Sequence, residues 1–545
     1  MFRHVSLAHS LALAAGLVAA LVSQPADACG CFAPTTTVTP VVQAGERILF
    51  AVDNGTVTAH IQIQYSGDAR SFGWLLPLPS VPTLKAGTDE LFDRLLAETD
   101  PIYVTQGNVK CRSLTLGCAA SAPLAGRSVI DQNADAGTGP AVKVGSVGPY
   151  EFAVLSAADK TEMIKWLNDN RFFIPAGTET AVDPYIAPGS YFLALKLRSD
   201  RDAGDITPVV LEYAASYPMI PLVLTSVGAL PNMGVQVWLL GEGRGIPRNF
   251  AHVVLNDSVL DWERGVSNYA QTVTRAVGEA PNKHAFITEY AGPSTPLKLD
   301  RARFGTQGQL ASSATLSEFL IALKVRRFGV DDPLPPQLVA VIAHELPVPD
   351  PLAARGITER AWVEQLDVWL GSYRDQHPED FVGYTATFDA TSLAAKVFED
   401  YVTPIQQAFG LFDRWPKLTR LFTTLSPEDM TADPVFAFNA ALPDVDRTHR
   451  GTQDFGCGTP EVTTEQGWIY KTDQDRSTLP AALSIASVPE EGAPTILTNN
   501  IPAIGKKVRV AENSPLTSQL GCSVDPLTMV SVAAVWAFSR RRRRR

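Results

Sequence analysis

The sequence predicts an α+β fold, in which a mainly antiparallel, β-rich N-terminal domain is followed by a helical region and a short C-terminal β segment. Three observations lead to this expectation. Apolar and polar residues alternate on both sides of an Asn-Gly pair near residue 54, which is typical of a β-hairpin. Strand-like runs outnumber helical runs up to about residue 292 and do not alternate regularly with them, as they would in a doubly wound sheet. Helical spacing then dominates from 293 to 455.

The hairpin is the clearest single element. It is predicted over residues 46–66, with its turn at Asn54-Gly55 and one face buried. His60 falls on the polar face, so we expect it to be solvated. The apolar run Ser71–Pro79 follows and predicts a strand that prolines terminate.

Further elements are predicted from local patterns. Strands are expected at Tyr191–Leu197, Val209–Tyr213, Ile220–Leu224, Val235–Leu240, Ala251–Leu255 and His284–Tyr290. Helices are expected from Thr88, from a capping box of Ser156 and Asp159, near Tyr269–Val277, from Thr315, and at Leu338–His344, Thr358–Leu370 and Thr391–Gln407. Residues 119–148 lack periodicity and predict a long loop, whereas strand-like pieces return between Cys457 and about Pro502.

These patterns divide the chain into six segments. They are a signal peptide (1–28), a β-rich exported domain (29–292), a mainly helical region (293–455), a C-terminal β segment (456–505), a linker (506–520) and a sorting or anchor tail (521–545).

The N-terminus has the pattern of a secretory signal. Arg3 supplies a positive charge, residues 11–22 are apolar, and Ala26-Asp27-Ala28 fits the rule for cleavage before Cys29. A membrane anchor is disfavoured because the apolar run is shorter than the roughly 20 residues that span a bilayer. Cys29 at a new N-terminus also suggests lipidation, although Asp27 departs from the usual pattern for that modification.

The C-terminus carries a second export feature. Gly521-Cys522 precedes an apolar stretch, Pro526–Phe538, and then six arginines, Arg540–Arg545. A helix that begins at Cys522 would reach roughly 27 Å, which barely spans the hydrocarbon core with the arginines on the cytoplasmic side. A solvated basic tail is the alternative, but it leaves the apolar run unexplained. The segment resembles the myxobacterial-type C-terminal sorting tag, which implies that Cys522 is a modification and sorting site and that the tail binds a membrane.

Charge argues against nucleic-acid binding. The whole chain carries a net charge of −11. The signal is neutral and the tail contributes +5, so the remaining body carries −16. Because affinity for nucleic acids comes largely from cationic contacts with phosphates, we expect no nucleic-acid partner.

The six cysteines predict disulfides in an oxidising compartment. Cys111 and Cys118 are close in sequence and are expected to pair, while Cys29 or Cys31 could pair with Cys457. If Cys522 is consumed by sorting, one of the other five cysteines is left over. Zinc is disfavoured because no Cys-x-x-Cys spacing or paired histidines accompany the cysteines.

Several segments together resemble a known family of exported bacterial proteins. They include Ala28–Pro34, Val42–Ile48, the hairpin strand Ala59–Tyr65, Trp74–Pro79, Trp166–Asn170, Val237–Gly241, Thr288–Gly292 and Leu418–Thr424. They are similar to the family grouped as domain of unknown function 2330. The resemblance implies an exported protein and carries no assigned activity.

A search for catalytic motifs finds none that is complete. There is no Gly-x-Ser-x-Gly elbow. His344-Glu345 begins like a metalloprotease helix, but Pro347 interrupts the motif and no second His follows at the required spacing. Gly241–Gly245 follows a strand but precedes another strand instead of a helix, so it predicts a turn. Glu212, Glu289 and Glu345 are available for acid–base chemistry, but the sequence does not show whether any two of them meet.

Calcium is the ion best matched by the sequence. Asp200, Asp202 and Asp205 place three carboxylates in one loop between predicted strands, and 131–135 carries a similar alternation. Both loops lack the Gly and Glu of the helix-loop-helix calcium site, so acidic solvated turns are the alternative. No other cofactor is expected.

The leading functional hypothesis is a non-enzymatic protein of the cell envelope, on the outer surface or in the periplasm, with a binding or structural role. Its ligand could be an extracellular protein or a polysaccharide. The alternatives are a secreted hydrolase with an active site that no motif reveals, and an assembly role for the tail in the membrane.

Overall fold

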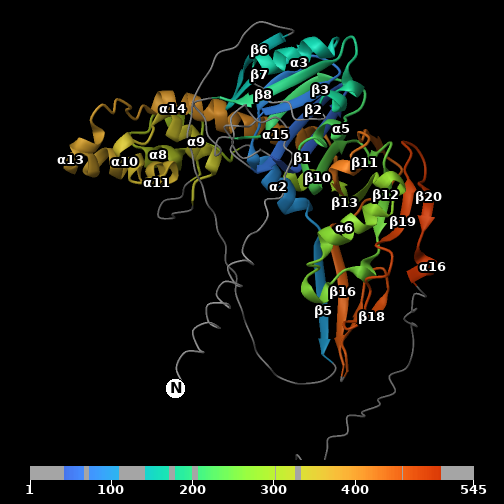
Figure 1. Ribbon diagram of the computed structural model, residues 1–545. Coiled ribbons are helices and arrows are strands. Elements are labelled where there is room, and N and C mark those ends of the chain that lie inside the picture. The colour runs from blue at the N-terminus through green and yellow to red at the C-terminus, as the bar shows by residue number, and fades with distance from the viewer. Residues whose placement is uncertain are drawn as a thin grey trace, which may run out of the picture. The chain divides into compact units, whose positions relative to one another are not determined.

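The computed structural model describes residues 42–66, 73–109, 141–170, 178–198, 206–300, 302–325, 333–456 and 458–504 (Figure 1). All of them belong to one unit of the chain, which extends to Lys506. Among these residues, no helix combines the length and the apolar character needed to cross a membrane.

The predicted hairpin is confirmed. Strands β1 (Val42–Asp53) and β2 (Thr56–Ser66) pair antiparallel up to Asp53 and Thr56. The two turn residues, Asn54 and Gly55, have φ values of 47° and 78°. Positive φ at both positions is the signature of the type I′ turn, whose twist matches that of the strands and which Asn-Gly adopts readily.

A ten-stranded sheet is built around this hairpin, in the order β20-β19-β12-β13-β14-β10-β1-β2-β9-β4. The added strands are β4 (Thr83–Ala86), β9 (Val209–Ala214), β10 (Ala229–Gly241), β12 (Ala251–Leu255), β13 (Ala285–Pro293), β14 (Lys417–Leu425), β19 (Ala482–Ser487) and β20 (Thr495–Asn499). The β1–β10 and β12–β13 pairs are parallel and the other pairs are antiparallel. With helices after residue 330 and short C-terminal strands, the predicted α+β class is confirmed.

A second sheet, in the order β3-β8-β7-β6, packs on one face of the ten-stranded sheet. Its strands are β3 (Gly73–Leu78), β6 (Ala141–Val147), β7 (Tyr150–Ser156) and β8 (Tyr191–Leu197). Ile48 and Phe50 of β1 share a core with Leu76 of β3 and Leu195 of β8. Helix α3 (Lys160–Asp169) covers the outer face of this second sheet.

Helices cover the opposite face of the ten-stranded sheet. Leu49 and Ala51 of β1 pack there with Phe92 of α2 (Asp89–Thr99) and with residues of the later helices. Those helices are α7 (Gln307–Ala311), α8 (Leu316–Ala322), α9 (Pro336–Glu345), α10 (Asp350–Ala354), α11 (Glu359–Glu364), α12 (Leu366–Val368), α13 (Arg374–Gln376), α14 (Ala390–Val397) and α15 (Thr403–Arg414), and Figure 1 shows most of them gathered on one side. Alternate residues of β1 therefore enter two different cores.

This covering overturns two expectations for the hairpin. Both of its faces are covered along much of its length, and His60 is only 4% exposed instead of solvated. Polar alternation along a strand marks a solvated face only when no other layer lies over that face.

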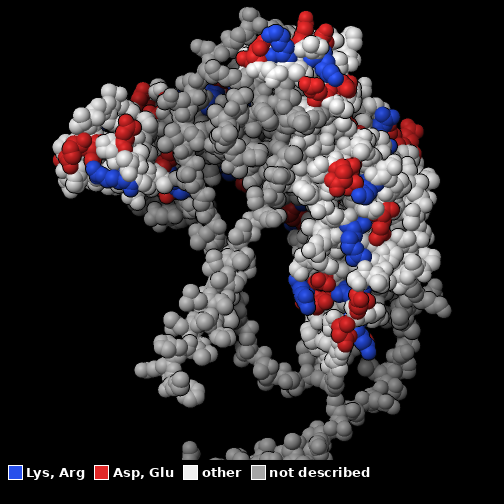
Figure 2. Space-filling model, viewed as in Figure 1, with Lys and Arg blue, Asp and Glu red and all other residues white. Residues whose placement is uncertain are grey.

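The remaining elements extend the framework. A smaller sheet has the order β18-β17-β16-β5, in which β5 (Ile102–Val109) pairs in parallel with β16 (Thr448–Phe455). The other elements are β11 (Arg244–Pro247), β15 (Phe436–Asn439), β17 (Glu461–Thr463), β18 (Ile469–Lys471), α4 (Thr178–Ala181), α5 (Leu222–Thr225), α6 (Tyr269–Gly278) and α16 (Ile501–Ile504). Figure 2 shows acidic and basic side chains side by side over the visible described surface.

Some local predictions are wrong. Residues 220–224 are not a strand, because Pro221 precedes the short helix α5. The predicted loop 119–148 includes strand β6 from Ala141. The N-cap of α3 is Asp159, whose side chain accepts from the Glu162 N–H, so Ser156 is not the capping residue. The helical run ends at Arg414, and strands β14 to β16 follow it.

Candidate ligand-binding cavity

A cavity of about 570 Å³ lies between the hairpin face of the ten-stranded sheet and strand β3. Its buried floor is formed mainly by apolar side chains, which are Ile48, Phe50, Ala59, Ile61, Leu76, Leu78 and Leu211, together with the buried carboxylate of Glu46. Its exposed edge is formed by Pro79, Pro184, Ser216 and Tyr217. A volume of this size lies within the range of roughly 300–1,000 Å³ that is usual for small-molecule sites.

The sequence of β3 explains why its sheet ends at this strand beside the cavity. β3 is an edge strand of its sheet, and Pro77 lies within it. Proline has no N–H to donate to a further strand, so the sheet stops here. Ser80 fixes the end of β3, because its hydroxyl accepts from the Ala214 N–H at 2.9 Å. This bond ties the end of β3 to the end of β9.

Tyrosines supply some of the polar groups of the wall, together with two serines and the Glu46 carboxylate. The Tyr185 hydroxyl donates to Asp433 Oδ2 at 2.7 Å, and Asp433 Oδ1 accepts from the Val223 N–H at 2.9 Å at the start of α5. Burial raises the pKa of Asp433. Tyr213 is 8% exposed, and burial raises the pKa of its phenol far enough that the group stays neutral. Apart from the Glu46 carboxylate, the polar side-chain groups of the wall are therefore hydroxyl groups.

Glu289 belongs to a buried ion cluster outside the cavity. Arg420 Nε lies 2.5 Å from Glu289 Oε2, and the guanidinium also pairs with Asp100. The Tyr269 hydroxyl donates to Glu289 Oε1 at 2.5 Å. Burial raises the pKa of Glu289, and the Arg420 charge opposes this shift. Because both carboxylate oxygens are engaged, this cluster is a stabilising contact between β13, β14 and the end of α2.

The other two candidate glutamates lie near a polar cleft of about 690 Å³ between the sheets and the helices. Glu345 lines this cleft beside His344 at the end of α9, so the predicted helix-end position of this pair is confirmed. Glu212 pairs with Lys85, another lining residue, at 2.8 Å. Most of the groups that line the cleft are charged or polar, and it lacks the apolar floor of the cavity.

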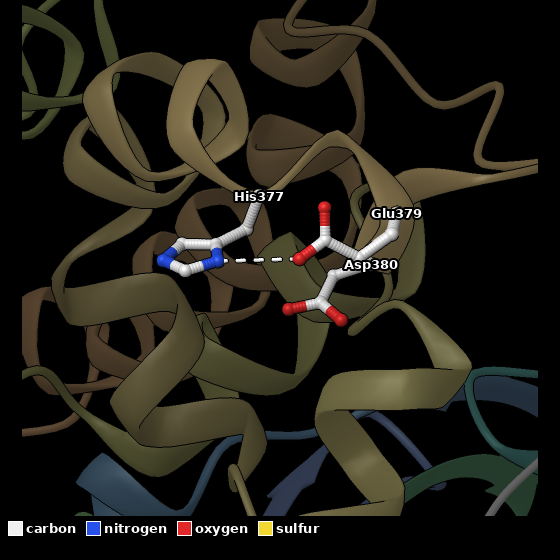
Figure 3. Close-up of side chains that lie close together, drawn as sticks. All are labelled: His377, Glu379 and Asp380. Carbon is white, nitrogen blue, oxygen red and sulfur yellow. Dashed lines mark hydrogen bonds and ion pairs between the residues drawn. The ribbon is translucent and has the colours of Figure 1, made fainter.

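A histidine and two carboxylates come together at the end of the helical region (Figure 3). His377 Nδ1 lies 3.3 Å from Glu379 Oε1. Asp380 is 2% exposed, and Arg355 donates to both of its carboxylate oxygens while the Tyr373 hydroxyl donates to Oδ2 at 2.9 Å. The bond with Arg355 holds the pKa of the Asp380 carboxyl below its usual range. A metal ion would have to displace this guanidinium, so we assign the cluster a structural role.

The residues singled out for calcium, disulfides and sorting are not placed by the structure. Asp200, Asp202 and Asp205, like all of the cysteines (Cys29, Cys31, Cys111, Cys118, Cys457 and Cys522), lie outside the described residues. The predicted turn at 241–245 is confirmed as the connection between β10 and β11.

The cavity was not predicted from the sequence. Its floor comes from strands that are far apart in the chain, and each floor residue has the pattern of ordinary core. The one local signal was the pair of prolines at the end of β3, which predicted a strand end and not an opening.

The fold and the cavity together define an α+β protein with a potential small-molecule site between two stacked sheets. Residues 24–327 match the model of an uncharacterized protein conserved in bacteria, DUF2330, and the chain belongs to this family. The resemblance seen in the sequence is thus confirmed. No curated protein and no solved structure matches the chain.

Proposed function

We propose that the protein is an exported, envelope- or surface-anchored binding protein that holds an apolar ligand in the cavity between β3 and the ten-stranded sheet. The observation that carries this proposal is the combination of a buried apolar floor and an exposed edge. A ligand that enters there is removed from water on several sides, and each buried methylene contributes roughly 0.8 kcal/mol.

The location rests on the two ends of the chain. The signal-like residues 1–28 and the Cys522-containing tail support export and attachment to a membrane. An envelope protein meets lipids and other amphiphiles at the membrane, so an apolar cavity suits that location. The calcium site at Asp200, Asp202 and Asp205 stays a prediction. The protein or polysaccharide ligand and the alternative of a secreted hydrolase stay predictions as well.

The test is binding of an acyl-chain probe whose fluorescence rises in apolar surroundings. We expect the delipidated full-length protein to bind the probe saturably. Replacing Ala59, which lies on the cavity floor, by phenylalanine fills part of the space and should weaken binding at least tenfold. Ala353→Phe, at an exposed position of α10, is the matched control and should bind like the wild type. Equal affinity of the Ala59→Phe variant, with folding verified by circular dichroism, would show that the ligand lies elsewhere.

A further inference from the structure

A positively charged group lies next to a residue of the exposed edge of the cavity. Tyr217 lines the cavity and is 37% exposed, so it lies where the space opens to solvent. The Arg248 guanidinium lies over its ring, 4.1 Å from the ring centroid. A cation over an aromatic face is attracted by the electrons of the ring.

The partner of Arg248 is a surface carboxylate. Arg248 Nε lies 2.6 Å from Glu490 Oε1, and the two side chains are 41% and 38% exposed. The Tyr217 hydroxyl contacts the same carboxylate at 3.3 Å. An ion pair between exposed side chains contributes little to stability, so another anion can replace the glutamate at little cost.

The order of these groups matches the two ends of an amphiphile. From the buried floor outward, the cavity lining changes from mainly apolar side chains, with the Glu46 carboxylate among them, to prolines and tyrosines. The Arg248 guanidinium lies over the ring of one of these tyrosines, Tyr217. Guanidinium groups bind carboxylates and phosphates through paired, charge-assisted hydrogen bonds.

We propose that the ligand is a single-chain amphiphile with an anionic headgroup, a carboxylate or a phosphate monoester. Its hydrocarbon chain lies in the cavity and its head pairs with Arg248 in place of Glu490. This inference rests on the proposed binding function and adds the class of ligand to it. Arg248 acts here as a specificity-determining residue, and Glu490 acts as a competing anion.

The experiment compares three ligands with the same chain: dodecanoate, dodecyl phosphate and the neutral dodecanol. Displacement of the fluorescent probe gives their affinities for the full-length protein. We expect the two anions to bind about tenfold more tightly than the alcohol at low salt and to lose this advantage as ionic strength rises. A preference for one anion over the other would identify the headgroup.

Two variants act in opposite directions. Arg248→Gln should remove the preference for both anions over dodecanol, because it removes the positive charge beside Tyr217. Glu490→Gln should raise the affinity for both anions about threefold, because it removes the competing carboxylate. Lys298→Gln, an exposed lysine paired with Asp413 at 3.5 Å outside the cavity lining, is the control and should have no effect.

The outcomes separate the two proposals. If all three ligands bind equally and Arg248→Gln has no effect, the headgroup inference is wrong while the apolar cavity remains a binding site. If none of the three ligands displaces the probe and Ala59→Phe also has no effect, the proposed function itself fails.

Discussion

Acid sensitivity from His60 is the prediction that the structure supports in most detail. His60 lies on β2 between Leu49 of β1 and Val210 of β9 and is 4% exposed. Burial, and then the positive charge of Lys85, lower its pKa to about 4. Its Nδ1 atom has no hydrogen-bond partner among the described residues.

The sign of the effect follows from linkage. In the unfolded chain His60 has a pKa of about 6.5, so it binds a proton below that pH while the folded protein does not. The free energy of unfolding is therefore unaffected by His60 above about pH 6.5. It decreases as the pH falls from there toward the pKa of His60 in the folded state. At 1.36 kcal/mol per pKa unit, the loss from this one group is about 2 kcal/mol at pH 5 and about 3 kcal/mol near pH 4.

The perturbation is His60→Leu, which removes the titrating group from a buried site. Urea unfolding at pH 7.5, 6, 5 and 4.5 gives the free energy of unfolding at each pH. Between pH 7.5 and pH 5, we expect the free energy of unfolding of the variant to fall by about 2 kcal/mol less than that of the wild type. His344→Leu, at an exposed position on α9, is the matched control and should retain the wild-type pH dependence.

A variant that loses as much stability as the wild type over this range would refute the assignment of the acid sensitivity to His60. The comparison isolates one residue because other groups titrate equally in both proteins. His252 is the main example, since burial and then the charge of Arg244 lower its pKa to about 3.

Two further predictions concern contacts within the chain. Arg420→Leu should destabilise the protein by about 3–5 kcal/mol, because it leaves the buried Glu289 carboxyl without its cation. The double variant with Glu289→Leu should recover much of this loss. Equal stabilities of Arg420→Leu and the wild type in thermal unfolding would argue against a buried ion pair. We also expect peptide mapping without reductant to find Cys111 linked to Cys118, as the sequence predicts, through thiol–disulfide exchange with an oxidoreductase of the export compartment. Recovery of a Cys111–Cys457 peptide would contradict this.

Elements with strong local signals were predictable from the sequence. The hairpin was found because Asn54-Gly55 favours the positive φ values that its turn needs. The start of α2 was found because Thr88 caps it through its side chain. The strand 251–255 was found because β-branched and apolar residues cluster there. In each case the determining interactions are between residues that are close in the chain.

Positions that depend on a second layer were not predictable. Strand β14 was assigned to the helical region, yet it lies between β13 and β10 and supplies the Arg420 that neutralises Glu289. His60 was expected in solvent, because the sequence of the hairpin does not show that another layer covers its polar face. Neither error could be corrected from neighbouring residues.

The sequence by itself therefore determined the family, the α+β class, the local elements and the acidic character of the body, along with the expectation of export. The tertiary structure decided which polar residues are buried, which charges meet and where a cavity remains. The physical reason is that turns and caps depend on backbone preferences within a few residues. Burial, pKa shifts and cavities instead depend on how sheets from distant segments stack.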